Sequence, residues 1–163
     1  RSGAVMGISS RKINEQAALY PYELIQRYAD RIGRPLELMN VVIMGVAFKG
    51  IPETTDIRGS VAINLLNVIK KHVGKVVGWD AVIKPVELKK LGFEITNDLR
   101  SAIEEADAVL ILNNHPSNMR SELYISSSRK RLLFDGWNQL DVSEVEKIPG
   151  LLYSTMGYMT QWE

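Results

Sequence analysis

Short apolar runs recur along the chain from residue 39 onward, and stretches with helical spacing separate them. The first run, residues 41–44, is rich in β-branched side chains and too short for a helix, so it predicts a strand buried on both faces of a parallel sheet. Further strands are predicted at residues 73–80, 92–96, 106–112, 131–135 and 151–154. Five or six short strands that alternate with helices are typical of an α/β fold, here a Rossmann-like, doubly wound parallel sheet.

Local signals mark where the helices between these strands begin. One helical pattern starts at Gly59 or Ser60 and continues through apolar positions as far as Ile69. Pro85 suits the first turn of a short helix within residues 82–91, because a proline lacks only an N–H group that has no partner there. Asp98 is a good N-cap for a helix over residues 99–105.

A different pattern occupies residues 9–33, where apolar side chains recur at three- and four-residue steps. This spacing predicts a long amphipathic helix with one apolar face, formed by Ile13, Ala17, Tyr20, Leu24, Ile25 and Tyr28. Ser9 or Ser10 would cap its start, Pro21 should kink or restart it, and Gly33 followed by Pro35 would end it. The face could pack against another domain or subunit, or against the chain's own sheet, and the pattern leaves both open.

The loop after the first predicted strand carries the first candidate chemistry. Gly45 and Gly50 bracket a segment that ends in Lys49. Open α/β sheets bind ligands at the carboxyl ends of their strands, and a lysine there can reach a phosphate beside a helix N-terminus. However, neither G-x-G-x-x-G nor G-x-x-x-x-G-K-[ST] is present, so a plain strand–helix connection with a solvated lysine is an equal alternative.

Polar residues follow the other strands at the same expected edge. Asp80 stands where a Rossmann domain would hold a ribose, but the first loop lacks the glycine fingerprint, so a cap or turn role is favoured. His115 has no partner triad in the sequence, which favours a role in stabilising a loop or at the edge of a ligand. Asp56 and Arg58 could pair with each other, or Arg58 could face a phosphate, and the spacing does not decide.

Composition excludes several classes of function. Twenty basic and nineteen acidic residues give a net charge of +1, so we expect no nucleic-acid partner. The chain has no cysteine, which excludes disulfides, thiolate metal sites and a cysteine nucleophile within it, and we predict no metal site. No stretch approaches about 20 apolar residues, so we expect no membrane partner and a cytoplasmic location. The sequence does not begin with methionine, and we expect it to be part of a longer protein.

Four separated motifs carry a family resemblance. The segment G-V-A-F-K at residues 45–49, followed by D-x-R-x-S at residues 56–60, resembles the start of the carboxyl-terminal domain of the UDP-glucose/GDP-mannose dehydrogenase family. In that family the pattern is close to G-L-A-F-K, a short loop and D-x-R-x-S. The segment R-K-I-N at residues 11–14 resembles the family's entry into a connecting helix, and D-G-W-N at residues 135–138 resembles its D-G-R-N segment. The resemblance covers nearly the whole chain.

The resemblance implies an NAD-dependent nucleotide-sugar 6-dehydrogenase, which oxidises a UDP-sugar to a UDP-uronic acid. In the family an amino-terminal Rossmann domain binds NAD, a central helical domain gives dimer contacts, and the last domain binds the nucleotide of the substrate. Residues 1–38 would then be the end of the central domain and the connecting helix, and residues 39–163 the nucleotide-sugar-binding domain. The absent domains would be its partners, in a homodimer or larger assembly.

The resemblance also implies roles for particular residues. Phe48 and Lys49 would meet the substrate, and Arg58 would lie near the junction of cofactor and substrate. Asp135, Trp137 and Asn138 would lie beside the substrate pocket. The family's catalytic cysteine belongs to segments that this sequence does not contain, so we expect no catalytic residue in this chain and no turnover by it alone.

Departures from the family pattern bear on the sugar. Trp137 replaces the arginine of D-G-R-N, and Gly59 and Ile57 replace the usual glutamate and threonine of D-T-R-E-S. Lys49 and Arg58 remain, so the nucleotide expectation is kept. The changes favour a UDP-acetamido-sugar over UDP-glucose. A stand-alone nucleotide-binding or assembly module without catalysis is the alternative.

Overall fold

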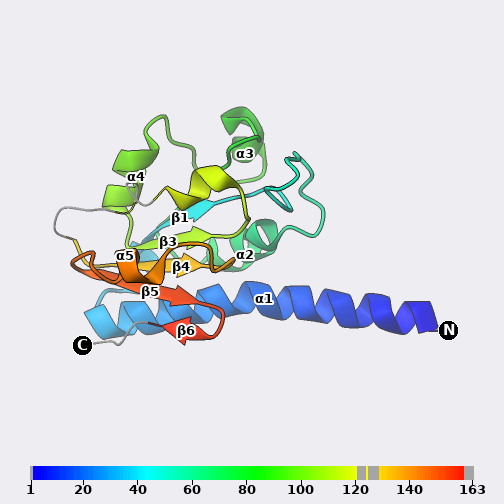
Figure 1. The fold of residues 1–163 in the computed structure, drawn as a ribbon, viewed down its shortest axis with the longest axis horizontal. Helices are drawn as coiled ribbons and strands as arrows, with labels where there is room; N and C mark the ends of the chain where they lie inside the picture. Colours follow the sequence, from blue (N-terminus) through cyan, green and yellow to red (C-terminus); the bar gives the residue numbers. More distant parts are fainter. Residues whose placement is uncertain (1, 121–123, 125–128, 160–163) are drawn as a thin grey trace.

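The computed structural model describes residues 2–120, 124 and 129–159, although the side chains of residues 2–15, 17 and 158 lie outside the description. Its elements alternate along the chain after a long first helix (Figure 1). The helices are α1 (Ser2–Ile32), η1 (Leu36–Leu38), α2 (Val61–Ile69), α3 (Pro85–Lys90), α4 (Leu99–Glu105), η2 (Pro116–Met119) and α5 (Val142–Val145). The strands are β1 (Asn40–Met44), β2 (Lys75–Trp79), β3 (Ala108–Ile111), β4 (Arg131–Asp135), β5 (Leu151–Thr155) and β6 (Tyr158–Met159).

The strands form one sheet in the order β2-β1-β3-β4-β5-β6. The first five are parallel, and β6 pairs with β5 in the antiparallel direction. The predicted Rossmann-like parallel sheet is therefore confirmed. In this order the chain runs outward in opposite directions from β1 and β3, so the topological switch point lies between their carboxyl ends.

One predicted strand is wrong. Residues 92–96 form no strand, and only an isolated bridge joins Glu94 to Val77. The Phe93 side chain packs over Gly78, where a Cβ atom would overlap its ring. Immediately afterwards the chain turns, because the Thr96 hydroxyl bonds to the backbone of Asp98, whose carboxylate caps α4 by accepting the Ser101 N–H. The capping geometry therefore ends the pairing after a single residue.

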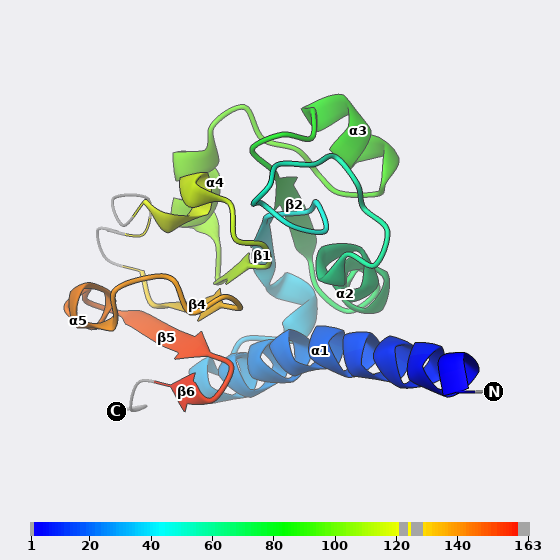
Figure 2. The same cartoon turned by 45° about the vertical axis from the view of Figure 1, so that its right-hand side comes forward.

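Both faces of the sheet are covered. Val41 and Ile43 of β1 point into a core formed with α1 and α2. Val42 and Met44 alternate onto the opposite face, where Ile103 of α4 and Val145 of α5 complete a second core. Figure 2 shows α1 and α2 on one side of the sheet and α4 on the other. This alternation on a sheet buried on both faces is what the continuous apolar run of β1 predicts.

Helix α1 differs from its prediction at its start, and it does not restart at Pro21. It begins at Ser2, not at Ser9 or Ser10, because serine costs little within a helix that continues upstream. It also continues through Pro21 without a restart. Leu24 and Ile25 are buried, and packing of this half against the domain holds the helix after the proline. Its end is confirmed, since Gly33 adopts a φ of 63° and Pro35 follows.

The position of α1 decides between the two alternatives for its carboxyl-terminal half. The side chains of Leu24, Ile25 and Tyr28 are buried in the core beside α2 and the sheet of the same chain. The amino-terminal half extends beyond the sheet (Figure 1). The side chains of Ile13 and Ala17, which were predicted on the same face, lie outside the described residues. Within the described part of the chain, no helix has the length and apolar character needed to cross a membrane.

Candidate functional site

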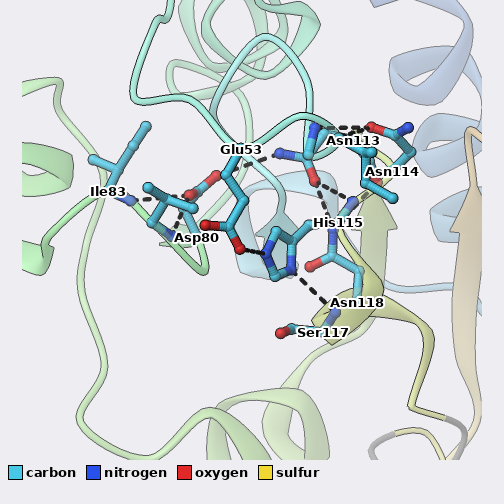
Figure 3. Close-up of polar contacts among 11 residues, drawn as sticks. Glu53, Asp80, Ile83, Asn113, Asn114, His115, Ser117 and Asn118 are labelled. Atoms are coloured by element: carbon cyan, nitrogen blue, oxygen red, sulfur yellow. Dashed lines mark hydrogen bonds and ion pairs between the residues drawn. The ribbon is translucent and has the colours of Figure 1, made fainter.

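Two loops meet at the switch point. One follows β1 and spans residues 45–60, and the other follows β3 and spans residues 112–118, including the start of η2. We call them the β1 loop and the β3 loop. Figure 3 shows their polar contacts, together with Asp80 after β2. Because the carboxyl ends of parallel strands face the same edge, these loops form the part of the fold where a ligand is expected.

The two glycines of the β1 loop allow this close approach. A Cβ atom on Gly45, which has a φ of 86°, would overlap the side chain of Asn113. A Cβ atom on Gly50 would overlap the backbone of His115. The G-x-x-x-x-G spacing therefore serves contact between the loops, a reason that the sequence alone did not reveal.

Asp80 anchors the start of the β1 loop. Its Oδ2 atom accepts the backbone N–H groups of Val46 at 2.8 Å and Ala47 at 2.9 Å. Its Oδ1 atom accepts those of Val82 at 2.8 Å and Ile83 at 3.0 Å. The side chain is buried and both oxygens are occupied by backbone donors. The favoured turn role is therefore confirmed, and no carboxylate oxygen is left to hold a ribose.

Asn114 of the β3 loop holds the middle of the β1 loop. Its Oδ1 atom accepts the N–H groups of Gly50 at 2.8 Å and Ile51 at 3.1 Å. Asn113 adds a bond from Nδ2 to the Ala47 carbonyl at 3.3 Å. Neither asparagine was predicted to have a role. Two amides directly after a buried strand were the available signal.

His115 ties the far part of the β1 loop. Its Nδ1 atom accepts the Ser117 N–H at 3.1 Å, so the ring proton lies on Nε2. Nε2 donates to the Glu53 carboxylate at 2.8 Å. The imidazole is buried, while the Glu53 side chain is 65% exposed. The predicted loop-stabilising role is confirmed.

The predicted substrate residues Phe48 and Lys49 lie between these ties. The Phe48 N–H donates to the Asp56 carbonyl at 2.7 Å, and its ring is 50% exposed. Lys49 is partly exposed. Among the residues that the structure describes, none forms a hydrogen bond or ion pair with its ammonium group. The β1 loop therefore presents a half-exposed aromatic ring and an uncompensated cation side by side in sequence.

Arg58 adopts one of its two expected arrangements. Its guanidinium pairs with the Asp56 carboxylate, with Nη2 at 2.7 Å from Oδ2 and Nε at 3.0 Å from Oδ1. These hydrogen bonds lower the pKa of Asp56 to about 2. The Arg58 side chain is 90% exposed, so the pair lies on the surface of the loop, open to exchange with a ligand phosphate.

After β4, a buried aspartate holds the loop from within, and a tryptophan is exposed on its surface. Asp135 is fully buried, and its carboxylate accepts N–H groups of Trp137, Gln139 and Leu140 and the hydroxyl of Tyr153. It therefore shapes this loop from within. Asn138 has a φ of 50°, a conformation that asparagine tolerates better than most residues.

Trp137 is the exposed side chain of this segment. Its Nε1–H donates to the Leu112 carbonyl at 3.1 Å, which links the segment to the β3 loop. The ring is nearly half exposed. Within the described residues, no hydrogen bond joins the segment 136–138 to the β1 loop. The structure thus brings the predicted residues to one edge of the sheet, but the described residues show no direct hydrogen bond between the β1 loop and the segment 136–138.

The start of α2 completes the site. The Ser60 hydroxyl donates to the Val46 carbonyl at 2.6 Å and accepts the Ile63 N–H at 3.4 Å, so Ser60 is the N-cap of α2. A groove of about 360 Å³ adjoins the β1 loop and is lined in part by Ile57, Ile83 and Lys84. None of the predicted site residues lines it. No group of three or more candidate metal ligands gathers anywhere in the described residues.

Residues 42–142 match the model of the UDP-glucose/GDP-mannose dehydrogenase family, UDP binding domain. UDP-glucose 6-dehydrogenase TuaD of Bacillus subtilis is 25% identical over 160 residues, covering 87% of this chain and 34% of that protein. The uncharacterized protein MJ1054 of Methanocaldococcus jannaschii is 27% identical over 159 residues, covering 89% of this chain and 17% of that protein.

Solved structures share the fold. A UDP-D-ManNAc dehydrogenase from Pyrococcus horikoshii has a TM-score of 0.68 at 23% identity, covering 90% of this chain and 32% of that one. An NDP-N-acetyl-D-galactosaminuronic acid dehydrogenase from Methanosarcina mazei has a TM-score of 0.69 at 21% identity, covering 91% and 31%. The chain spans 34% of TuaD and a smaller share of MJ1054. Since the family model matches residues 42–142 of 163, the chain belongs to the UDP-glucose/GDP-mannose dehydrogenase family and contains its UDP-binding domain.

Proposed function

We propose that this chain binds the nucleotide of a UDP-sugar as the last domain of an NAD-dependent nucleotide-sugar 6-dehydrogenase. One observation carries the proposal: the Lys49 ammonium has no partner among the described residues, on a loop that is held in place at the switch point. A cation presented in this way attracts a diphosphate, and the nine-residue helix α2 directs its N-terminus from the end of the same loop.

Calorimetric titration with UDP tests this function. Lys49→Ala should weaken UDP by about 1–3 kcal/mol, or about 5- to 150-fold in Kd, as for other hydrogen bonds to charged groups. Lys71→Ala is the matched control, because it removes the same charge from an exposed position after α2. Added salt should weaken wild-type binding, since part of the site is exposed. Equal UDP affinity in the Lys49→Ala variant and the wild type would contradict the proposal.

The dehydrogenase part of the proposal concerns the whole enzyme. Covalent catalysis of the family's kind needs a nucleophile, and this chain has no cysteine. We therefore expect NAD and the oxidising step to involve segments outside this sequence. The chain mixed with a UDP-sugar and NAD should produce no NADH. Production of NADH would contradict the proposal that oxidation needs other segments, and UDP binding would still be tested separately by calorimetry.

An acetamido sugar is the proposed sugar class. Gly59 has only the Phe48 ring within 4 Å of the position that a Cβ would take, at 3.7 Å, where the family pattern has a glutamate. Without the glutamate side chain, the space beside the exposed aromatic ring can take an added acetyl group. A panel of UDP-glucose, UDP-N-acetylglucosamine and UDP-N-acetylmannosamine, titrated under the same conditions, separates these sugars. Preference for UDP-glucose would contradict this assignment.

A further inference from the structure

We propose that Asn114 is a positioning residue for Lys49, an inference that rests on the proposed binding of UDP. The Gly50 N–H belongs to the peptide unit that directly follows Lys49, and it donates to Asn114 Oδ1 at 2.8 Å. The Ile51 N–H donates to the same atom at 3.1 Å. One side chain, 64 residues away in sequence, therefore holds the backbone from which the lysine extends.

The chemistry of the contact fixes the orientation of the amide. Both partners are backbone N–H donors, so the atom that meets them must be the acceptor oxygen of Asn114. A bridging acceptor for two successive N–H groups defines the direction of the chain at that point. Without it, two backbone donors of a loop would lose their protein partner, and the loop would gain freedom around Lys49.

The neighbouring contacts explain why this tie acts on Lys49 in particular. On the amino-terminal side, Asp80 accepts the Ala47 N–H and Asn113 donates to the Ala47 carbonyl. On the carboxyl-terminal side, Asn114 holds Gly50. Only Phe48 and Lys49 lie between the two ties. The lysine backbone is thus clamped on both sides, which reduces the conformational freedom that a ligand would otherwise have to restrict on binding.

The outer tie reaches an exposed carboxylate. His115 donates to the Glu53 carboxylate, which is 65% exposed. Because the Glu53 side chain is exposed, the pair contributes less than a fully buried one would, and Glu53 lies farther along the loop from Lys49 than Gly50 does. Asn114 is therefore the β3-loop residue whose loss should most affect the lysine, since it holds the peptide unit that directly follows Lys49.

Amide hydrogen exchange in the ligand-free chain tests the tie directly. In Asn114→Ala, protection of the Gly50 and Ile51 amides should fall by about 10-fold, while the Val46 and Ala47 amides, which Asp80 holds, should keep theirs. Asn114→Asp retains an acceptor oxygen and should restore protection at Gly50 and Ile51. Unchanged exchange at these two amides in Asn114→Ala overturns the proposal.

UDP titration then tests the consequence for binding. Asn114→Ala should weaken UDP by about 3- to 10-fold, the effect of about one lost hydrogen bond. Asp98→Ala is the structural control, because it removes the N-cap of α4 and should lower the melting temperature without affecting UDP affinity. Equal losses of UDP affinity in both variants would mean that Asn114 acts only through general stability. A wild-type chain that does not bind UDP would contradict the proposed function, whereas the exchange result judges the tie separately.

Discussion

The Val46 N–H donates to the buried carboxylate of Asp80 across 2.8 Å, and this contact joins the end of β1 to the end of β2. The same carboxylate accepts three further backbone N–H groups, those of Ala47, Val82 and Ile83. Asp80, which stands where a Rossmann domain would hold a ribose, therefore holds the loop backbone instead.

Asp80→Asn should destabilise the fold. An asparagine amide can direct its oxygen at only one pair of backbone donors, so its NH2 group would face the other pair. Loss of these hydrogen bonds within a buried site should lower the free energy of unfolding by about 1.5–3 kcal/mol, measured by urea denaturation. Asp98→Asn, at an exposed cap, is the control and should cost less. An Asp80→Asn variant as stable as the wild type would show that the four bonds contribute little.

The sequence predicted the parts of the fold that depend on local pattern. The apolar runs located β1, β3, β4 and β5, the helical spacing of apolar residues located α2, and the cap at Asp98 located α4. The strand expected at residues 92–96 failed because the Thr96–Asp98 turn competes with pairing. The antiparallel β6 was not predicted, since two residues carry no recognisable period.

The site was less predictable than the fold because its contacts cross between loops. Asn114 and Gly50 are 64 residues apart, and their bond depends on the register of β1 beside β3, which no local pattern encodes. The structural roles of Asp80 and His115 were predicted correctly. The sequence lacks the glycine fingerprint that a ribose-binding Asp80 would need, and it lacks a partner triad for a catalytic His115. Whether Arg58 pairs with Asp56 or faces a phosphate depends on its side-chain rotamer, and in the structure that rotamer points at Asp56.

A phosphate ligand should change the ionisation of Asp56. In the ligand-free chain, hydrogen bonds from Arg58 lower the pKa of Asp56 to about 2. The carboxylate is thus favoured in the fold above its ordinary pKa, and that advantage disappears as pH falls through about 2. If a pyrophosphate draws Arg58 away, the pKa of Asp56 should rise toward its ordinary value.

Carboxyl NMR titration of Asp56, with and without UDP or NAD, measures this change. Arg58→Ala without ligand supplies the upper reference, because it removes the partner altogether. A pKa that stays at about 2 in the presence of either saturating ligand would show that Arg58 remains with Asp56, contrary to its proposed place near the cofactor and substrate.

Trp137 should influence the choice of sugar more than the affinity for UDP. An indole ring can stack on a sugar face but cannot make the bidentate contacts of an arginine. We expect Trp137→Ala to change the ratio of affinities for UDP-sugars while the Kd for UDP changes little, both measured by calorimetry. Trp137→Phe keeps a ring but removes the bond to the Leu112 carbonyl, and it should retain more of the preference. Equal losses for all ligands would assign Trp137 a packing role alone.

Tyr28 should make the fold sensitive to alkaline pH. Burial raises the pKa of its hydroxyl to about 12, with a further contribution from Asp107. A raised pKa means that the neutral phenol is favoured in the fold, so stability is complete below the ordinary value of 10.0 and falls as pH rises through about 12. Denaturation at pH 9 and pH 11 should show a smaller loss in Tyr28→Phe than in the wild type. The same loss in both proteins would place the alkaline sensitivity elsewhere.

Arg131 is a buried cation whose replacement should be tolerated. Its Nη1 atom donates to the Ile103 carbonyl at the end of α4, but Nη2 is buried without a hydrogen-bond partner in the described part of the chain. Burial lowers the pKa of the guanidinium, which indicates that desolvation of the charge is costly, although the charge of Glu104 offsets part of it. The Ile103 carbonyl also accepts the Ala106 N–H, so it would keep a partner without the arginine.

Arg131→Met therefore removes the desolvation cost while retaining a long side chain in the core. By analogy with replaced buried ion pairs, the free energy of unfolding should stay the same or rise by about 1–4 kcal/mol, measured by urea denaturation. Arg131→Ala leaves a cavity and should be destabilised by comparison, which separates the effect of charge from that of volume. A clear loss of stability in Arg131→Met, comparable to that in Arg131→Ala, would show that the buried guanidinium stabilises the junction of α4 and β4 through its charge.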